Sequence, residues 1–199
     1  MRLDKGLSDL LAGRQHLSML RALAQLPLGL ERSGRDMARR AGMDNSTADR
    51  VLQDLAAQGA VHVHRVPPAN HFSLNRENVL VGAILKALEV EAGLQEELLK
   101  FVREELEETG VVEARLFGSA ARGEMRPDSD VDLALIAREG QQEQVEDAAS
   151  RLHEQIWRRF GVRPSFLVGE ISVGEMKRGE ETEYGVWHRV ETEGLGIVG

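Results

Sequence analysis

Apolar residues in the first third of the chain recur at helical spacing and are interrupted by turn-forming residues. Leucines between positions 17 and 26 share one helical face, and that helix is predicted to stop at Pro27. A second helix is predicted from about Ser33 to Ala41. A third is predicted over residues 46–58, after a run of residue types that cap helices. The period then changes to two, with a Pro/Asn turn between two runs, which predicts a β-hairpin over residues 61–74.

The remaining pattern predicts one long helix and then alternating strands and helices. Helical spacing extends over residues 77–109, with Gly93 as its weakest position. Strands are predicted at 111–117, 130–136 and 162–168, with a helix at 141–160. A helical turn at 173–178, a helix at 184–193 and a strand at 195–198 follow. This order predicts an α+β chain in three parts: a domain at 1–76, a connecting helix at 77–109 and a domain at 110–199.

Charge is divided unevenly between these parts. The chain of 199 residues has a net charge of −8, but residues 1–76 have a net charge of +4 and residues 77–199 have a net charge of −12. An overall negative charge argues against a nucleic-acid partner only when the charge is evenly spread. The opposite signs therefore predict two separate functions, with the first part as the candidate for binding DNA.

Composition excludes several classes of protein. The chain has no cysteine, which excludes a disulfide scaffold, a zinc–thiolate site and a cysteine nucleophile, and fits a reducing compartment. The longest apolar run, residues 79–85, is too short to cross a membrane, and the first residues lack the hydrophobic stretch of a secretory signal. We therefore expect a cytoplasmic protein with no membrane partner.

The order helix, helix, turn, helix, hairpin over residues 17–76 resembles the winged helix-turn-helix domains of the MarR/ArsR type. This resemblance implies that residues 46–58 form the recognition helix and residues 61–74 the wing, and that the chain binds double-stranded DNA as a homodimer. The predicted base-reading residues are Thr47, Arg50 and Gln53. The predicted phosphate contacts are Arg39, Arg40 and Arg65. A winged helix that binds protein instead of DNA is the alternative.

The strongest chemical motif lies where the predicted strand 111–117 ends. Gly118 and Ser119 follow this strand, and a glycine–serine turn lets the backbone approach a phosphate closely. Asp130 and Asp132 are two residues apart at the start of the next predicted strand, so their carboxylates project from one face. Paired carboxylates opposite a phosphate-binding turn suit a Mg²⁺ ion held against a nucleoside triphosphate.

This motif resembles that of the DNA polymerase β-like nucleotidyltransferase superfamily, in its minimal, MNT-type branch. The resemblance covers about residues 110–199 and implies a mixed sheet with helices on one side. It implies Asp130 and Asp132 as catalytic residues and metal ligands, with Gly118, Ser119 and Arg122 binding the nucleotide. It also implies Mg²⁺, a nucleoside triphosphate with ATP as the expected one, and transfer of a nucleotidyl group to an acceptor hydroxyl. Because the branch includes toxin–antitoxin pairs, a partner protein of that kind is a candidate acceptor.

One element of the superfamily pattern is missing. Active members place a third carboxylate on the strand predicted here at 162–168, where it binds the metal or activates the acceptor hydroxyl. The comparable position in this chain is Ser165, and Glu170 is the nearest acid. The alternative function is therefore a transcriptional regulator whose transferase-like domain is weak or inactive and senses nucleotide or mediates dimerisation.

Overall fold

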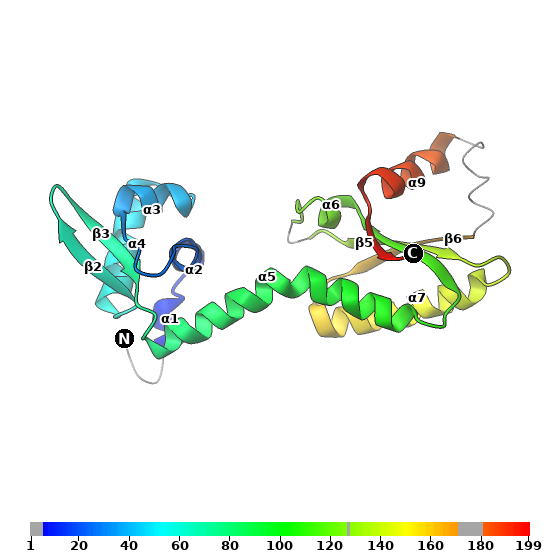
Figure 1. Ribbon diagram of the computed structural model, residues 1–199, viewed down its shortest axis with the longest axis horizontal. Helices are drawn as coiled ribbons and strands as arrows, with labels where there is room; N and C mark the ends of the chain where they lie inside the picture. Colours follow the sequence, from blue (N-terminus) through cyan, green and yellow to red (C-terminus); the bar gives the residue numbers. More distant parts are fainter. Residues whose placement is uncertain (1–5, 127, 171–180) are drawn as a thin grey trace. The chain divides into compact units, whose positions relative to one another are not determined.

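The computed structural model describes residues 6–126, 128–170 and 181–199, and the chain divides into two compact units, Met1–Ala92 and Gly93–Gly199 (Figure 1). The helical turn predicted at 173–178 lies outside the described residues. Helix α5 (Val79–Leu106) begins in the first unit and ends in the second, and Gly93 does not interrupt it. Within the described ranges, no helix is long and apolar enough to cross a membrane.

The first unit has the predicted order of helices and hairpin. Its elements are α1 (Gly6–Leu10), α2 (Arg14–Ala24), β1 (Arg32–Ser33), α3 (Gly34–Arg40), α4 (Asn45–Ala57), β2 (Val61–Val66) and β3 (Ala69–Leu74). The two elements that the pattern did not predict, α1 and β1, are the shortest. Strand β1 pairs with β3, so the hairpin becomes a three-stranded sheet in the order β1-β3-β2.

Side-chain caps fix where α3 and α4 begin. The Ser33 hydroxyl accepts a hydrogen bond from the Asp36 backbone N–H at 3.3 Å, and the Asp44 carboxylate accepts one from the Thr47 backbone N–H at 2.9 Å. Each cap satisfies a backbone donor that has no acceptor within its own helix. Helix α4 buries Ala48, Val51, Leu52 and Leu55, which lie on one face at helical spacing. These caps and this stripe orient the outward face of α4.

The second unit is built on a four-stranded mixed sheet in the order β6-β5-β4-β7. Its elements after α5 are β4 (Val111–Phe117), α6 (Gly118–Ala121), β5 (Val131–Ala137), α7 (Gln142–Phe160), β6 (Pro164–Glu170), α9 (Glu181–Glu193) and β7 (Leu195–Val198). Strands β5 and β6 are parallel, and β4 is antiparallel to both β5 and β7. The prediction of an α+β chain with a mixed sheet is confirmed.

The two faces of this sheet are covered differently (Figure 1). Helix α7 and the C-terminal half of α5 pack on one face, where Leu133, Leu152 and Val102 are in one buried cluster. These two helices fit the expectation of helices on one side. Asp132 alternates with the core residues Val131 and Leu133 along β5, so its side chain projects from the opposite face. Helix α9 lies at that face and lines a pocket together with Asp132. The face of the sheet that carries Asp132 is therefore partly covered by α9.

Candidate functional site

The turn between β4 and α6 requires a glycine for two reasons. Gly118 has φ +71°, a left-handed conformation that residues with a Cβ adopt only with strain. A Cβ at this position would also overlap Oδ2 of Asp132 and would lie 3.2 Å from its Cγ. The glycine therefore lets the Asp132 carboxylate lie directly against the backbone of the turn.

The two aspartates of the motif lie at the start of β5. Asp132 is level with Phe117 on β4 and is partly buried, whereas Asp130 lies just before the strand and is exposed. Burial raises the pKa of Asp132 above its ordinary value, and the negative charge of Asp130 raises it further; Arg189 and Arg122 act in the opposite direction. Two interacting carboxylates of this kind form a site that a divalent cation would stabilise.

A pocket of about 300 Å³ opens at this place, lined by Phe117, Gly118, Ser119, Arg122, Asp132, Arg189 and Glu193. The structure thus brings together four of the predicted residues: Gly118, Ser119, Arg122 and Asp132. Arg189 and Glu193, which the sequence reasoning missed, come from α9. Their separation of four residues on one helix is the only signal in the sequence, and it does not show that they face the motif.

Arg122 joins α6 to α9 through ion pairs. Its Nη1 lies 2.6 Å from Oε2 of Glu193, and its Nε lies 2.9 Å from Oε2 of Glu124. The hydrogen bond to Glu124, followed by the one to Glu193, raises the pKa of Arg122 above its ordinary value. The predicted nucleotide-binding arginine is therefore a permanent cation with two carboxylate partners.

The strand register identifies the residue at the position where a third carboxylate was expected. Ser165 on β6 is level with Asp132 on β5. Glu170 is level with Ala137, five residues further along, which is about 16 Å at the rise of a strand. Glu170 therefore cannot replace a carboxylate at Ser165. Within the described residues, no group of three or more His, Cys, Asp or Glu side chains could hold a metal ion.

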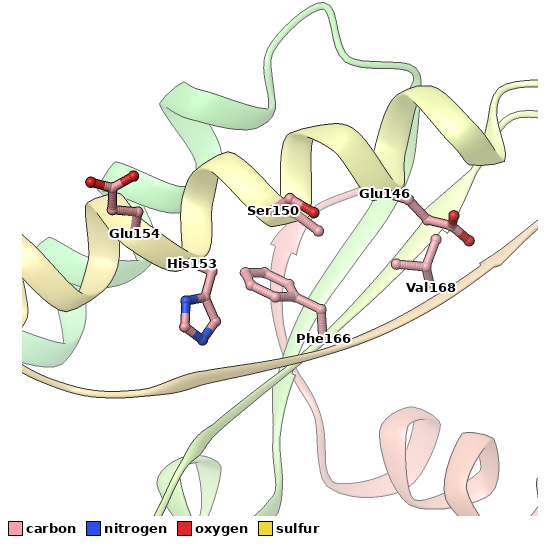
Figure 2. Close-up of a pocket in the computed structure, with 7 residues that line it drawn as sticks. Glu146, Ser150, His153, Glu154, Phe166 and Val168 are labelled. Atoms are coloured by element: carbon pink, nitrogen blue, oxygen red, sulfur yellow. The ribbon is translucent and has the colours of Figure 1, made fainter.

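A second pocket of the same unit lies on the other face of the sheet (Figure 2). It has a volume of about 450 Å³ and lies between α7 and β6, with Phe166 and Val168 from β6 and His153 from α7. Its charged side chains include Glu146 and Glu154, and no Lys or Arg among the described residues lines it. Phosphate chemistry therefore fits the pocket at Asp132 and does not fit this one.

In the first unit, the N-terminal turn of α4 is held by Asp44. The Thr47 hydroxyl donates to Oδ2 of Asp44 at 2.7 Å, and the Ser46 hydroxyl donates to Oδ1 at 2.6 Å. Hydrogen bonds from Ser46 first, and then from Thr47, hold the pKa of Asp44 well below its usual range. The hydroxyl of Thr47, a predicted base-reading residue, thus has a capping partner within the chain.

The other predicted base-reading residues are exposed on the same helix. Arg50 donates through Nη2 to Oε1 of Gln15 at 2.9 Å, and its Nη1 lies 4.0 Å from Asp54. Gln53 is exposed one turn of α4 before the helix ends. Both side chains project from the face opposite the buried stripe, where a partner could contact them.

The predicted phosphate contacts lie on α3 and on the hairpin. Arg39 and Arg40 both pair with Asp36, together with Arg32 at 3.4 Å. The hydrogen bond and charge of Arg40, followed by those of Arg39, lower the pKa of Asp36. Three guanidinium groups on one carboxylate leave a net positive cluster. Arg65 is exposed on β2, level with Asn70 on β3 at the tip of the hairpin.

The fold and these sites define a winged helix-turn-helix DNA-binding domain followed by a nucleotidyltransferase domain. Residues 16–65 match the family model of the IclR helix-turn-helix domain, and residues 96–188 match the family model of the nucleotidyltransferase domain. The predicted recognition of both domains is confirmed, with the IclR type as the matched helix-turn-helix family. The chain therefore combines a DNA-binding module and a nucleotidyltransferase module in one polypeptide.

Solved structures resemble each part separately. The homodimeric winged helix-turn-helix DNA-binding domain of a candidate ArsR-family regulator from Mycobacterium bovis is 27% identical over 45% of this chain and 81% of that chain, with a TM-score of 0.36. NolR from Sinorhizobium fredii is 25% identical over 45% and 82%, with a TM-score of 0.37. A candidate nucleotidyltransferase from Sulfolobus solfataricus is 21% identical over 51% and 80%, with a TM-score of 0.31. No curated protein matches the chain.

Proposed function

We propose that the chain is a DNA-binding nucleotidyltransferase whose second unit binds a Mg²⁺-nucleoside triphosphate, with ATP as the expected nucleotide, and transfers a nucleotidyl group to an acceptor hydroxyl. The observation that carries this proposal is the contact between Gly118 and Asp132 beside a pocket lined by Arg122 and Arg189. A phosphate-binding turn, a carboxylate and two cations in one pocket meet the requirements of a triphosphate bound with a metal ion.

The residues present fit a divalent cation shared with the nucleotide. Mg²⁺ in nucleotide sites is held by one or two carboxylates together with substrate phosphates, and here Asp130 and Asp132 would hold it. When bound, the cation would neutralise phosphate charge and polarise the phosphoryl group. The turn at Gly118 and Ser119 would admit the phosphates close to the backbone, while Arg122 and Arg189 would balance their charge.

Calorimetric titration of the full chain with Mg²⁺-ATP tests this proposal. Asp130→Asn and Asp132→Asn each remove a carboxylate and are expected to abolish measurable binding. Asp128→Asn is the matched control, because Asp128 is an exposed acid of the same loop. Binding that survives Asp132→Asn unchanged would refute the site. A labelled nucleotide that becomes attached to an acceptor would then establish transfer.

Ser165 favours a second candidate function, a regulator whose second unit binds nucleotide without efficient transfer. Ser165 is level with Asp132, where a third carboxylate would activate the acceptor, and losing such a group costs orders of magnitude in turnover. This candidate predicts tight binding of Mg²⁺-ATP with no transfer to protein, RNA or small-molecule acceptors. The first candidate predicts transfer, with a protein of a toxin–antitoxin pair as one acceptor to test.

For the first unit, the proposal is that α4 enters the major groove of double-stranded DNA and that Arg39, Arg40 and Arg65 contact phosphates. Arg50→Gln is expected to weaken binding to an operator fragment, and Arg65→Gln is expected to lower the salt slope by about one unit. Lys86→Gln, an equal charge change at an exposed position of α5, is the control. If all three variants bind equally, the assignment of this surface is wrong.

The proposed active form is a homodimer, because paired winged helices read two half-sites of an operator. Light scattering coupled to gel filtration measures the mass directly. A stable species at the chain mass of 22.0 kDa, with and without operator DNA, would refute the dimer.

A further inference from the structure

Helix α9 places a carboxylate inside the candidate nucleotide pocket. Glu193 lines the pocket together with Arg189, and it is the last residue of α9. A carboxylate at the C-terminal end of a helix is unfavourable, because the helix macrodipole gives that end partial negative charge. Arg122 supplies the compensating cation, with its Nη1 2.6 Å from Oε2 of Glu193.

The guanidinium that Glu193 binds is also the one that a phosphate would need. The Arg122 and Glu193 side chains are 43% and 36% exposed, so another anion can reach the pair. A phosphate group offers several acceptor oxygens to an arginine, whereas the structure gives Glu193 one hydrogen bond to it. Phosphate and Glu193 therefore compete for Arg122.

We propose that Glu193 is a specificity-determining residue of this pocket. Its charge makes phosphate binding depend on a divalent cation, and its side chain leaves Arg122 when a triphosphate binds. This inference rests on the proposed nucleotide site. Glu193 adds a second negative charge to a pocket that already contains Asp132, so a bare polyphosphate meets repulsion that a metal-bound one does not. Loss of the ion pair on binding frees the last turn of α9 from α6.

Titration with inorganic tripolyphosphate, with and without Mg²⁺, tests the competition in the full chain. Glu193→Gln keeps the shape of the side chain and removes its charge. We expect this variant to bind Mg²⁺-tripolyphosphate about two- to fivefold more tightly than the wild type, the range that an exposed ion pair supplies. Without Mg²⁺ the gain in affinity of Glu193→Gln should be larger, because no metal ion then neutralises the phosphate charge that the Glu193 carboxylate repels.

Glu124→Gln is the matched control. Glu124 is also paired with Arg122, but its side chain is 66% exposed and it does not line the pocket. A smaller gain than that of Glu193→Gln is expected. Equal gains in the two variants, or no gain in Glu193→Gln, would overturn the proposal. Thermal unfolding of each variant establishes that it is folded.

Hydrogen exchange gives a readout independent of affinity. Amides of residues 190–193 should exchange faster when Mg²⁺-tripolyphosphate binds to the wild type, and should already exchange faster in Glu193→Gln. Unchanged exchange on binding would overturn the release of α9. A wild-type chain that binds neither Mg²⁺-ATP nor tripolyphosphate refutes the proposed function, whereas binding that Glu193→Gln does not alter refutes only this inference.

Discussion

Alanine at position 118 separates two requirements of the turn at Gly118: its left-handed backbone conformation and its contact with Asp132. Gly118 has φ +71° and Gly123 has φ +69°, so an alanine at either position costs about 1–2 kcal/mol for the left-handed conformation. Only at position 118 does the new Cβ overlap the Asp132 carboxylate. A Cβ at Gly123 has no described neighbour within 4 Å. Gly123→Ala is therefore a matched control for Gly118→Ala.

Both variants should lose a similar amount of stability, because both place an alanine in the left-handed backbone conformation. A loss of about 1–2 kcal/mol corresponds to a melting temperature about 2–8 °C lower in a chain of this size. Trp157 and Trp187 are the two tryptophans of the chain, and both belong to the second unit, so their fluorescence follows the unfolding of the unit that contains both glycines. A further loss in Gly118→Ala measures how firmly Asp132 is held in place.

The binding of Mg²⁺-ATP should distinguish the two variants. In Gly118→Ala the Asp132 carboxylate must turn away, and losing about 1.4 kcal/mol of metal coordination is enough to weaken binding tenfold. Gly123→Ala should bind as the wild type does. Calorimetry at a temperature where both variants are folded measures the affinities. If the two variants bind Mg²⁺-ATP equally, the inference that the contact between Gly118 and Asp132 builds the site is refuted.

Three further predictions concern single side chains. Ser165→Asp places a carboxylate level with Asp132 and should tighten Mg²⁺-ATP binding and increase nucleotide transfer, whereas the uncharged Ser165→Asn should do neither. Calorimetry measures the binding and a labelled nucleotide measures the transfer. Equal behaviour of the two variants would contradict the inference from the strand register. Because the folded-state pKa of Asp132 is raised, its ionisation opposes folding at a pH above the unfolded-state value of 3.8. Asp132→Asn should therefore stabilise the second unit at neutral pH. This advantage should be lost as the pH falls from the raised folded-state pKa to 3.8, and a constant difference across pH would contradict the prediction. Asp44→Ala should destabilise the first unit, whereas Asp44→Asn should retain the cap, because an asparagine side chain still offers an oxygen acceptor. The lowered folded-state pKa of Asp44 gives the wild type stability that is lost as the pH falls below the unfolded-state value of 3.8, so the advantage of the wild type over both variants should shrink at low pH. Circular dichroism of the helices measures the unfolding, and equal loss of stability in both variants at neutral pH would refute the capping role.

Local pattern predicted most of the secondary structure because its causes are local. The helix predicted over residues 46–58 is confirmed as α4, because its cap at Asp44 and its buried stripe depend on neighbours within one or two turns. Elements α1 and β1 escaped prediction because they are short, and β1 exists only through its pairing with β3. A strand of two residues has no periodicity of its own to detect.

The candidate site was predictable only where its residues are neighbours in sequence. Gly118 follows a strand that the pattern identified, and Asp132 alternates with buried residues along the next strand. Asp130 is near Asp132 in sequence, but it lies just before β5 and is exposed. Arg189 and Glu193 could not be found in this way. They reach the pocket because α9 packs beside β4 and α6, and such a long-range arrangement leaves no spacing signal in the chain.

Charge and periodicity are properties of consecutive residues, so they are enough to predict a basic helix-turn-helix module followed by an acidic module with two nearby carboxylates. Which side chains come into contact depends on how the chain folds. The tertiary structure set Ser165 level with Asp132, since the register of parallel strands depends on how α7 returns the chain to the sheet. It also placed Glu193 on Arg122, since that ion pair joins side chains 71 residues apart.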